Sequence, residues 1–245
     1  MIKKMTYLFL VLQVACSPSE CFQSAGKTIT KEITVENFDK ILVGNEISLI
    51  IKQGITQKVV VKTGENLIDN ISVKVINNQL QLEDNTTCNI TRDYALTKVI
   101  VTSPNIKQIR SNTARTIKSE GSINFNSLTL ISEDNFNSKY LNIGDFQLTV
   151  NNTNLTIISN GDSTFNIDGN CTNLNIGFYS GSSRFNGKNL ISENVVFTHK
   201  SSNDILVHPV NSLEGVIYIN GDVISFNQPP IINVEERYTG RLLFN

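Results

Sequence analysis

The sequence contains no tryptophan and little proline, methionine, histidine or cysteine, with 5 Pro, 2 Met, 2 His and 4 Cys in 245 residues. Two histidines are too few to build a metal site by themselves, and no C-x-x-C spacing occurs, so no metal or cofactor is expected. Long apolar runs with a helical period are also missing, which excludes a fold built on helices. The net charge is −1 without a basic stripe, so we expect no nucleic-acid partner.

Glycine, asparagine, serine and threonine are plentiful, and this composition is typical of β-structure. Apolar residues alternate with polar ones through residues 31–103, which predicts an amino-terminal β region of half-buried, antiparallel or mixed strands. The alternating positions include Ile33 and Val35; Ile47, Leu49 and Ile51; Val59 and Val61; and Val99 and Val101. Asn77-Asn78 predicts a tight hairpin, because asparagine tolerates positive φ. Residues 65–70 are expected to form one helical turn.

A repeat of about twenty residues dominates the carboxy-terminal half. Small turn residues recur at Gly161, Gly181, Ser201 and Gly221, and large apolar residues recur at Phe165, Phe185 and Ile205, with Phe226 one residue late. We also expect Thr156, Ile176, Val196 and Val216 to form one stacked column, and Ile158, Phe178, Thr198 and Tyr218 another. A period near twenty with short β-rich runs is typical of a coiled parallel sheet, so residues 104–245 are predicted to form a β-solenoid.

The two ends of this coil need protection, because one rung cannot bury its apolar face alone. We expect the amino-terminal β region to cap one end. At the other end, Pro229-Pro230 is expected to stop strand pairing, so that residues 231–245 fold across the last rung as a carboxy-terminal cap. The step of twenty also relates Leu128 to Leu148 and Leu130 to Val150, and a phase slip before Leu155 is interpreted as one shortened turn.

The amino terminus has the features of an export signal. Lys3 and Lys4 precede the apolar run 5–14, which is too short to span a bilayer as a mature helix. Residues 1–15 resemble the signal peptide of a bacterial lipoprotein precursor, and the resemblance implies cleavage before Cys16 and acylation of its thiol. Residues 16–30 would then be a tether. The alternative is an ordinary secretory signal that is cut nearby and leaves Cys16 as a plain thiol.

The remaining cysteines are odd in number. Cys21 and Cys88 flank the amino-terminal β region and are candidates for a disulfide in an oxidising compartment. Cys171 lies in a predicted turn and has no evident partner in the sequence.

Several segments together resemble the head GIN domain family of autotransporter-adhesin-like proteins common in Bacteroidota. The resemblance covers residues 31–242 and is carried by Phe38-Asp39-Lys40-Ile41, Ile50-Ile51-Lys52-Gln53-Gly54, Val59-Val60-Val61, Val101-Thr102-Ser103-Pro104, the Gly-Asp turns at Gly161 and Gly221, and Pro229-Pro230-Ile231-Ile232-Asn233-Val234. It implies a short right-handed β-solenoid behind a small β region, on a lipoprotein or secreted protein. It supplies no catalytic residues.

The candidate ligand-contact strip consists of outward polar and aromatic residues: Asn175, Tyr179, Arg184, Asn203 and Tyr218. Amide hydrogen bonds and ring contacts suit a cell-surface glycan or protein. We therefore expect an exported, lipid-anchored, non-catalytic binding or adhesion protein of the cell envelope, held at the outer membrane through Cys16. The alternative is a carbohydrate-active β-helix enzyme with acids grouped on one face, for which the candidates are Asp134, Asp145, Asp162, Asp168 and Asp222.

Overall fold

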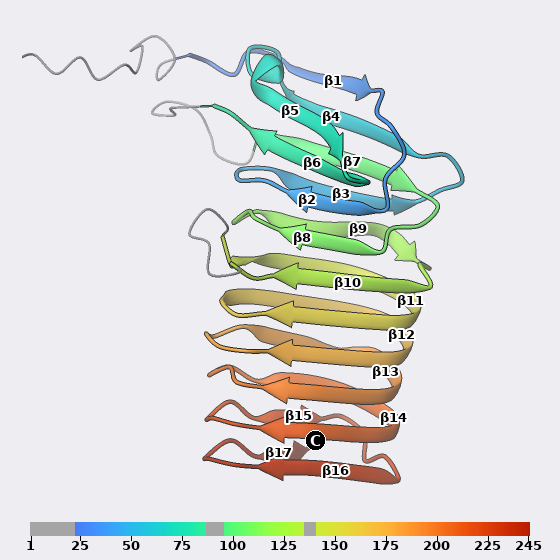
Figure 1. Cartoon of the computed structure of the whole chain (residues 1–245), viewed down its shortest axis with the longest axis vertical. Coiled ribbons are helices and arrows are strands. Elements are labelled where there is room, and N and C mark those ends of the chain that lie inside the picture. The colour runs from blue at the N-terminus through green and yellow to red at the C-terminus, as the bar shows by residue number, and fades with distance from the viewer. Residues whose placement is uncertain (1–22, 87–95, 135–140) are drawn as a thin grey trace, which may run out of the picture.

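The computed structural model describes residues 23–86, 96–134 and 141–245, and these residues form almost exclusively β-strands (Figure 1). The one helical element among them is the 3-10 turn η1 (Ile68–Asn70). The strands are β1 (Thr28–Ile33), β2 (Lys40–Val43), β3 (Ser48–Gln53), β4 (Lys58–Gly64), β5 (Ile71–Ile76), β6 (Gln79–Asp84), β7 (Lys98–Ser103), β8 (Gln108–Ser111), β9 (Thr116–Ile123), β10 (Ser127–Ser132), β11 (Ile143–Ser159), β12 (Asp162–Phe178), β13 (Arg184–His199), β14 (Ile205–Ile217), β15 (Val223–Ser225), β16 (Ile231–Glu236) and β17 (Leu242–Phe244). The all-β prediction and the predicted helical turn are confirmed.

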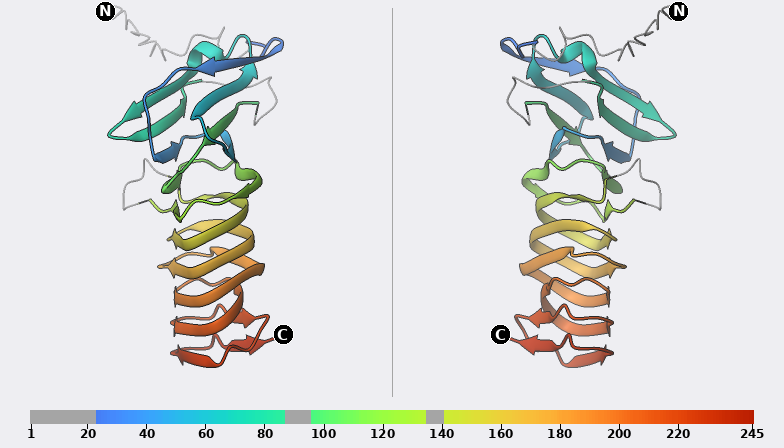
Figure 2. Two further views of the ribbon diagram at one scale, coloured as in Figure 1. Left: turned by 90° about the vertical axis from the view of Figure 1, so that its right-hand side faces the viewer. Right: turned by 90° about the vertical axis from the view of Figure 1, so that its left-hand side faces the viewer.

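The carboxy-terminal half is a stack of strands in which each rung pairs with the rungs before and after it. β10 pairs with β11, β11 with β12, β12 with β13 and β13 with β14, and every one of these pairings is parallel. Each long strand bends midway, so the stack has two layers that are joined along one edge by bends and along the other by turns (Figure 1). Figure 2 shows the same stack from its two sides.

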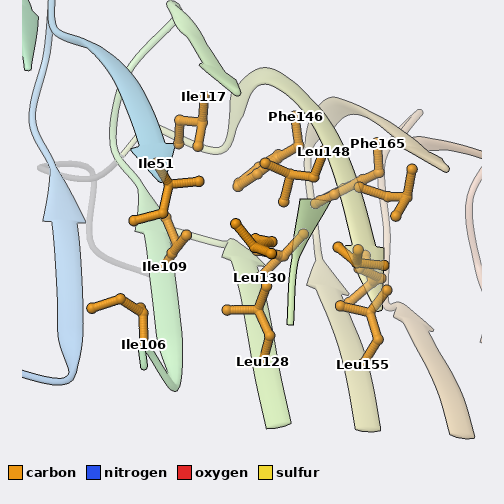
Figure 3. Packing of buried hydrophobic residues seen from close by; sticks show 14 of the residues in the cluster. Ile51, Ile106, Ile109, Ile117, Leu128, Leu130, Phe146, Leu148, Leu155 and Phe165 are labelled. Atoms are coloured by element: carbon orange, nitrogen blue, oxygen red, sulfur yellow. The ribbon is translucent and has the colours of Figure 1, made fainter. Parts of the chain in front are cut away.

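The hydrophobic core fills the space between the two layers (Figure 3). Phe146 and Phe165 are fully buried on successive strands, and their rings stack with centroids 4.7 Å apart at 10°. Leu128, Leu130 and Leu155 face them from the other layer. Burial of each such side chain stabilises the fold by about 1.5–3 kcal/mol, so the core favours the stacked arrangement strongly.

The predicted alignment of residues twenty positions apart is confirmed for one column of stacked residues and is wrong for the others. Phe165 pairs with Phe185 and Phe185 with Ile205, as predicted, but Ile205 then pairs with Val223 instead of Phe226. The column that contains Ile176 is Ile157, Ile176, Phe197 and Gly215, with steps of 19, 21 and 18 residues.

The column of Thr156, Ile176, Val196 and Val216 therefore does not exist. Val196 pairs with Asn175 and Glu214, and it is 47 % exposed on the outer face. The second expected column is also wrong, since Phe178 pairs with Ser159 and His199. Bulges at the bends of β13 and β14 change the number of residues in a rung. An alignment with a constant step of twenty therefore misplaces some residues by one position, which assigns them to the opposite face of the sheet.

The phase slip before Leu155 is explained by a different pairing. Leu128 pairs with Leu155 and Leu130 with Ile157, whereas Leu148 pairs with Ile167. Residues 143–159 form the single bent strand β11, so no shortened turn is present there. The expected alignment of Leu128 with Leu148 is wrong because these two residues belong to different layers.

The amino-terminal strands form a mixed sheet at one end of the stack (Figure 1). β1–β4, β4–β7 and β5–β6 are antiparallel, whereas β2 pairs in parallel with β6 and β8, and β3 with β7 and β9. The predicted hairpin between β5 and β6 is confirmed, with φ of 50° at Asn77 and 62° at Asn78. Hydrogen-bonded pairing thus continues from this region into the stack through β2 and β3.

The expected carboxy-terminal cap is wrong. β16 pairs in parallel with β14, and β17 pairs in parallel with β15, so residues 231–244 add one more rung. Pro229 and Pro230 lie in the bend before β16, where no ladder hydrogen bond is lost, and therefore do not end the stack. This rung carries the exposed apolar residues Ile231, Ile232, Tyr238, Leu243 and Phe244.

Side-chain ladders support the stack on its surface and inside it. On the surface, Asn173 donates from Nδ2 to Oδ1 of Asn154 at 3.0 Å, and Asn194 donates to Oδ1 of Asn173 at 3.1 Å. Inside, at the edge formed by the turns, the hydroxyls of Ser159 and Ser183 are 2.7 Å apart. These contacts satisfy polar groups from rung to rung and help to fix the register.

Candidate functional site

One outer edge of the stack carries a column of alternating aromatic and cationic residues. Tyr179, Lys200, Tyr218 and Arg237 each follow the last residue of a strand, in β12, β13, β14 and β16 respectively. Their backbone N–H groups bond to the preceding rung: Tyr179 to O of Ser159 at 2.9 Å, Lys200 to O of Phe178 at 2.8 Å, Tyr218 to O of His199 at 2.9 Å, and Arg237 to O of Ile217 at 2.9 Å. We call these four residues the aromatic–cation column.

The ring of Tyr218 lies between two cations. Nζ of Lys200 and Cζ of Arg237 are each 4.7 Å from the ring centroid. The backbone ladder puts Lys200 on the rung before Tyr218 and Arg237 on the rung after it, so the two cations cover opposite faces of the ring. Each contact is worth about 0.5–1 kcal/mol at an exposed site. Tyr218 therefore presents its edge and hydroxyl, and its faces are already occupied.

Tyr179 presents more of its ring than Tyr218 and is 50 % exposed. The ring folds back over Gly177, where a Cβ atom would lie 2.7 Å from Oη of Tyr179. Only glycine leaves room for the tyrosine to lie against the outer face of β12 in this way. The result is an aromatic surface supported by the sheet, which suits contact with an apolar face of a ligand.

The charges in the column are not equivalent. Nε and Nη2 of Arg237 donate to the two carboxylate oxygens of Glu235 at 2.8 and 3.0 Å, and these bonds lower the pKa of Glu235. Lys200 makes no ion pair with any carboxylate in the described ranges. Its ammonium group, between Tyr179 and Tyr218 in the column, is the cation available to an external anion or hydroxyl.

The predicted strip is divided between several positions. Tyr179 and Tyr218 share the aromatic–cation column. Asn203 lies in the turn after Lys200, where Nδ2 donates to O of Ser182 at 2.7 Å. Asn175 is exposed within β12, and Arg184 is the exposed first residue of β13, beyond the turn that follows Tyr179.

Sequence reasoning missed Lys200 and Arg237. The column positions 179, 200, 218 and 237 are separated by 21, 18 and 19 residues, so a constant step of twenty does not align them. For the same reason, a constant step pairs Tyr218 with Thr198 instead of Lys200. These four residues share one feature: each directly follows the last residue of a strand. That shared position is the signal that could have identified the column.

The aspartates proposed for the enzyme alternative have turn roles at two of the repeat positions. The carboxylate of Asp162 accepts hydrogen bonds from the N–H of Ser182, at 3.2 Å, and from its hydroxyl. Asp222 accepts from the N–H of Arg241 at 2.8 Å. Within the described ranges, no group of three or more His, Cys, Asp or Glu is arranged to hold a metal ion.

Cys171 is a buried free thiol on β12, 3.3 Å from Oγ of Ser192, and burial raises its pKa. Cys16, Cys21 and Cys88 lie outside the described residues, as does the signal segment, so lipidation and the disulfide stay predictions. None of the helices in the described residues has the length and hydropathy needed to cross a bilayer.

The chain matches the family model described as "putative auto-transporter adhesin, head GIN domain" over residues 37–229. The chain belongs to the head GIN domain family. This match confirms the resemblance that the sequence motifs indicated, and it extends from before β2 into the bend that precedes β16. A comparison with curated proteins finds no match.

Three solved structures from Bacteroidota have a similar fold. A protein from Bacteroides fragilis NCTC 9343, described as "a putative adhesin", matches with a TM-score of 0.79 at 18 % identity, covering 91 % of this chain and 100 % of that one. A "putative lipid binding protein" from Parabacteroides distasonis ATCC 8503 matches with a TM-score of 0.63 at 14 % identity, covering 90 % and 97 %. A "putative adhesin" from Parabacteroides merdae ATCC 43184 gives a TM-score of 0.56 at 15 % identity, covering 89 % and 97 %. At these identities the likeness shows the fold alone.

Proposed function

We propose that this head GIN protein is an exported, lipid-anchored binding protein of the cell envelope, and that it acts without catalysis. The aromatic–cation column is the observation that carries the proposal. It presents a half-exposed tyrosine, a lysine without an ion pair among the described residues, and a tyrosine edge on successive rungs, at the strand spacing of about 4.8 Å. Such a row suits an extended ligand that lies along the stack, and a cell-surface glycan is the class we favour.

The scaffold for this display is, in our proposal, a right-handed parallel β-solenoid. A rigid stack holds the column at fixed spacing, so the ligand meets a preorganised surface and less ordering entropy is lost on binding. The membership of the chain in an adhesin-like family supports a place in the cell envelope.

The proposed anchor is an acylated Cys16 at the outer membrane. β1, the first strand after the tether, lies at the end of the molecule opposite to β16 and β17 (Figures 1 and 2). An anchor that leads into β1 would therefore place the last rungs farthest from the bilayer. The variant Cys16→Ser should appear in the soluble fraction of cells, whereas unchanged recovery in membranes would remove lipidation from the proposal.

The binding role is tested on a glycan array with the secreted chain from residue 17 onward. We expect Tyr179→Ala and Lys200→Gln each to weaken retention on the bound glycans by about tenfold, which corresponds to about 1.4 kcal/mol. Tyr238→Ala and Lys74→Gln are the matched controls, because Tyr238 is 66 % exposed and both residues lie outside the column. Equal binding by column and control variants would contradict the site. Cleavage of a bound glycan would instead favour the carbohydrate-active alternative.

A further inference from the structure

A pocket of about 580 Å³ lies at the bends of β13 and β14, away from the aromatic–cation column. Asn186 pairs with Leu206 and Ile191 with His208, so four residues of β13 lie between these pairs where β14 has only one, Val207. The extra residues make the bend of β13 longer than the bend of the next rung. Lys188 and Asn189 of this bend line the pocket, whereas the residues of the aromatic–cation column follow the ends of their strands.

The apolar part of the pocket comes from Ile191 and Phe226. Ile191 is 46 % exposed, although it is a large aliphatic residue on a well-paired strand. Phe226 is the residue that falls one position late in the repeat, because Val223 takes the core position above Ile205. Its N–H bonds to O of Val207 at 2.8 Å, which holds the backbone at the pocket.

The polar part of the pocket comes from Lys188, Asn189 and His208, and no carboxylate of the residues that the structure describes lines it. Nδ1 of His208 is 3.3 Å from the carbonyl oxygen of Lys188, so the neutral ring donates through Nδ1 and keeps Nε2 for other contacts. Lys188 is exposed and makes no ion pair with a carboxylate in the described part of the chain. The charge of the pocket is therefore positive beside an apolar floor.

We infer that this pocket binds a small amphipathic anion, in which a carboxylate or phosphate monoester is attached to an alkyl or aryl group. The volume is within the range of small-ligand sites, about 300–1,000 Å³. The apolar body lies against Phe226 and Ile191, and the anionic head meets the ammonium group of Lys188. The amide of Asn189 adds donors for the same head. This site is separate from the column and does not depend on the glycan-binding proposal.

The inference is tested by NMR titration of the isotope-labelled secreted chain with octanoate, octyl phosphate and octanol. We expect chemical-shift changes centred on residues 188–191, 208 and 226 with both anions. Octanol should bind about tenfold more weakly, since it lacks the charge that Lys188 recognises. The difference between octanoate and octyl phosphate identifies which head group the pocket prefers.

Two variants separate the parts of the pocket. Lys188→Gln should weaken the binding of both anions by about tenfold and leave the binding of octanol unchanged. Phe226→Ala should weaken the binding of all three ligands. Lys74→Gln and Phe244→Ala are the matched controls, because Lys74 is an exposed lysine on β5 and Phe244 is 46 % exposed on β17. An unchanged thermal unfolding curve shows that each variant is folded. Equal affinity for octanol and octanoate, shifts spread over the last rung, or no binding at millimolar ligand would overturn the inference.

Discussion

The imidazole of His199 lies edge-on to the ring of Phe178 from the preceding rung, with 6.2 Å between the ring centroids and 61° between the planes. His199 is fully buried at the end of β13. Burial lowers its pKa from 6.5 to about 4, and the opposing effects of Asp204 and Asp222 do not cancel this shift. At neutral pH the folded protein therefore holds His199 without charge.

This burial predicts a loss of stability in mild acid. The unfolded chain takes up a proton near pH 6.5 and the folded chain only near pH 4, so the stability present above pH 6.5 falls as the pH drops through this window. The shift corresponds to about 3 kcal/mol. His199→Leu should reduce the difference in unfolding free energy between pH 7.5 and 4.5 by about 2.5 kcal/mol, most of this amount, as measured by urea denaturation. An identical pH dependence in the variant would contradict the assignment.

The phenylalanine core predicts a strong effect of truncation at Phe165. This ring is fully buried and stacks on Phe146, so Phe165→Ala should lower the free energy of unfolding by about 3–5 kcal/mol. Phe244→Ala removes the same atoms from a residue that is 46 % exposed, and it should cost less than about 1 kcal/mol. Urea unfolding compares the two, and similar losses would exclude the layered core described above.

Two glycines with positive φ, Gly181 in a turn and Gly121 within β9, predict different effects of substitution by alanine. Gly181 has φ of 81°, and a Cβ there would lie 2.4 Å from O of Gly161 on the preceding rung. Gly121 has φ of 77° with no atom within 4 Å of that position. Gly121→Ala should cost only the conformational strain, about 1–2 kcal/mol, and Gly181→Ala should cost clearly more. Equal shifts in melting temperature would show that the rungs do not approach each other this closely.

The surface ladder of asparagines predicts a measurable loss at Asn173, which donates to Asn154 and accepts from Asn194. Asn173→Ala should destabilise the protein by about 1 kcal/mol, the usual net value of hydrogen bonds of this kind. The neighbouring exposed residue provides the control, and Thr172→Ala should change stability by less than about 0.5 kcal/mol. An Asn173→Ala variant with unchanged stability would mean that water molecules replace the asparagine hydrogen bonds without loss of stability.

The all-β class, the stacked rungs and the amino-terminal hairpin could be predicted because they depend on local patterns. Alternation identifies a strand, and two adjacent asparagines identify the turn at Asn77-Asn78. The large aromatic positions were also aligned correctly from Phe165 to Ile205, because those turns keep one length. These features need no knowledge of which strand lies beside which.

The exact register could not be predicted, since it depends on the lengths of the bends. One extra residue moves every following side chain to the opposite face, and this places Val196 outside and Phe197 inside. The same shifts hid the alignment of Lys200 with Tyr218 and the displacement of Phe226 into a pocket. The fate of residues 231–245 was missed because Pro229-Pro230 falls in a bend, where proline does no harm to the ladder.

The stack has a consequence for the length of this protein. Each rung pairs only with its neighbours, and β16 and β17 repeat the pairing of the rungs before them. Insertion or loss of one whole rung therefore leaves every other contact unchanged and alters the length by one strand spacing, about 4.8 Å. The length of such a stack can therefore change in small, even increments while the surfaces of the remaining rungs stay the same.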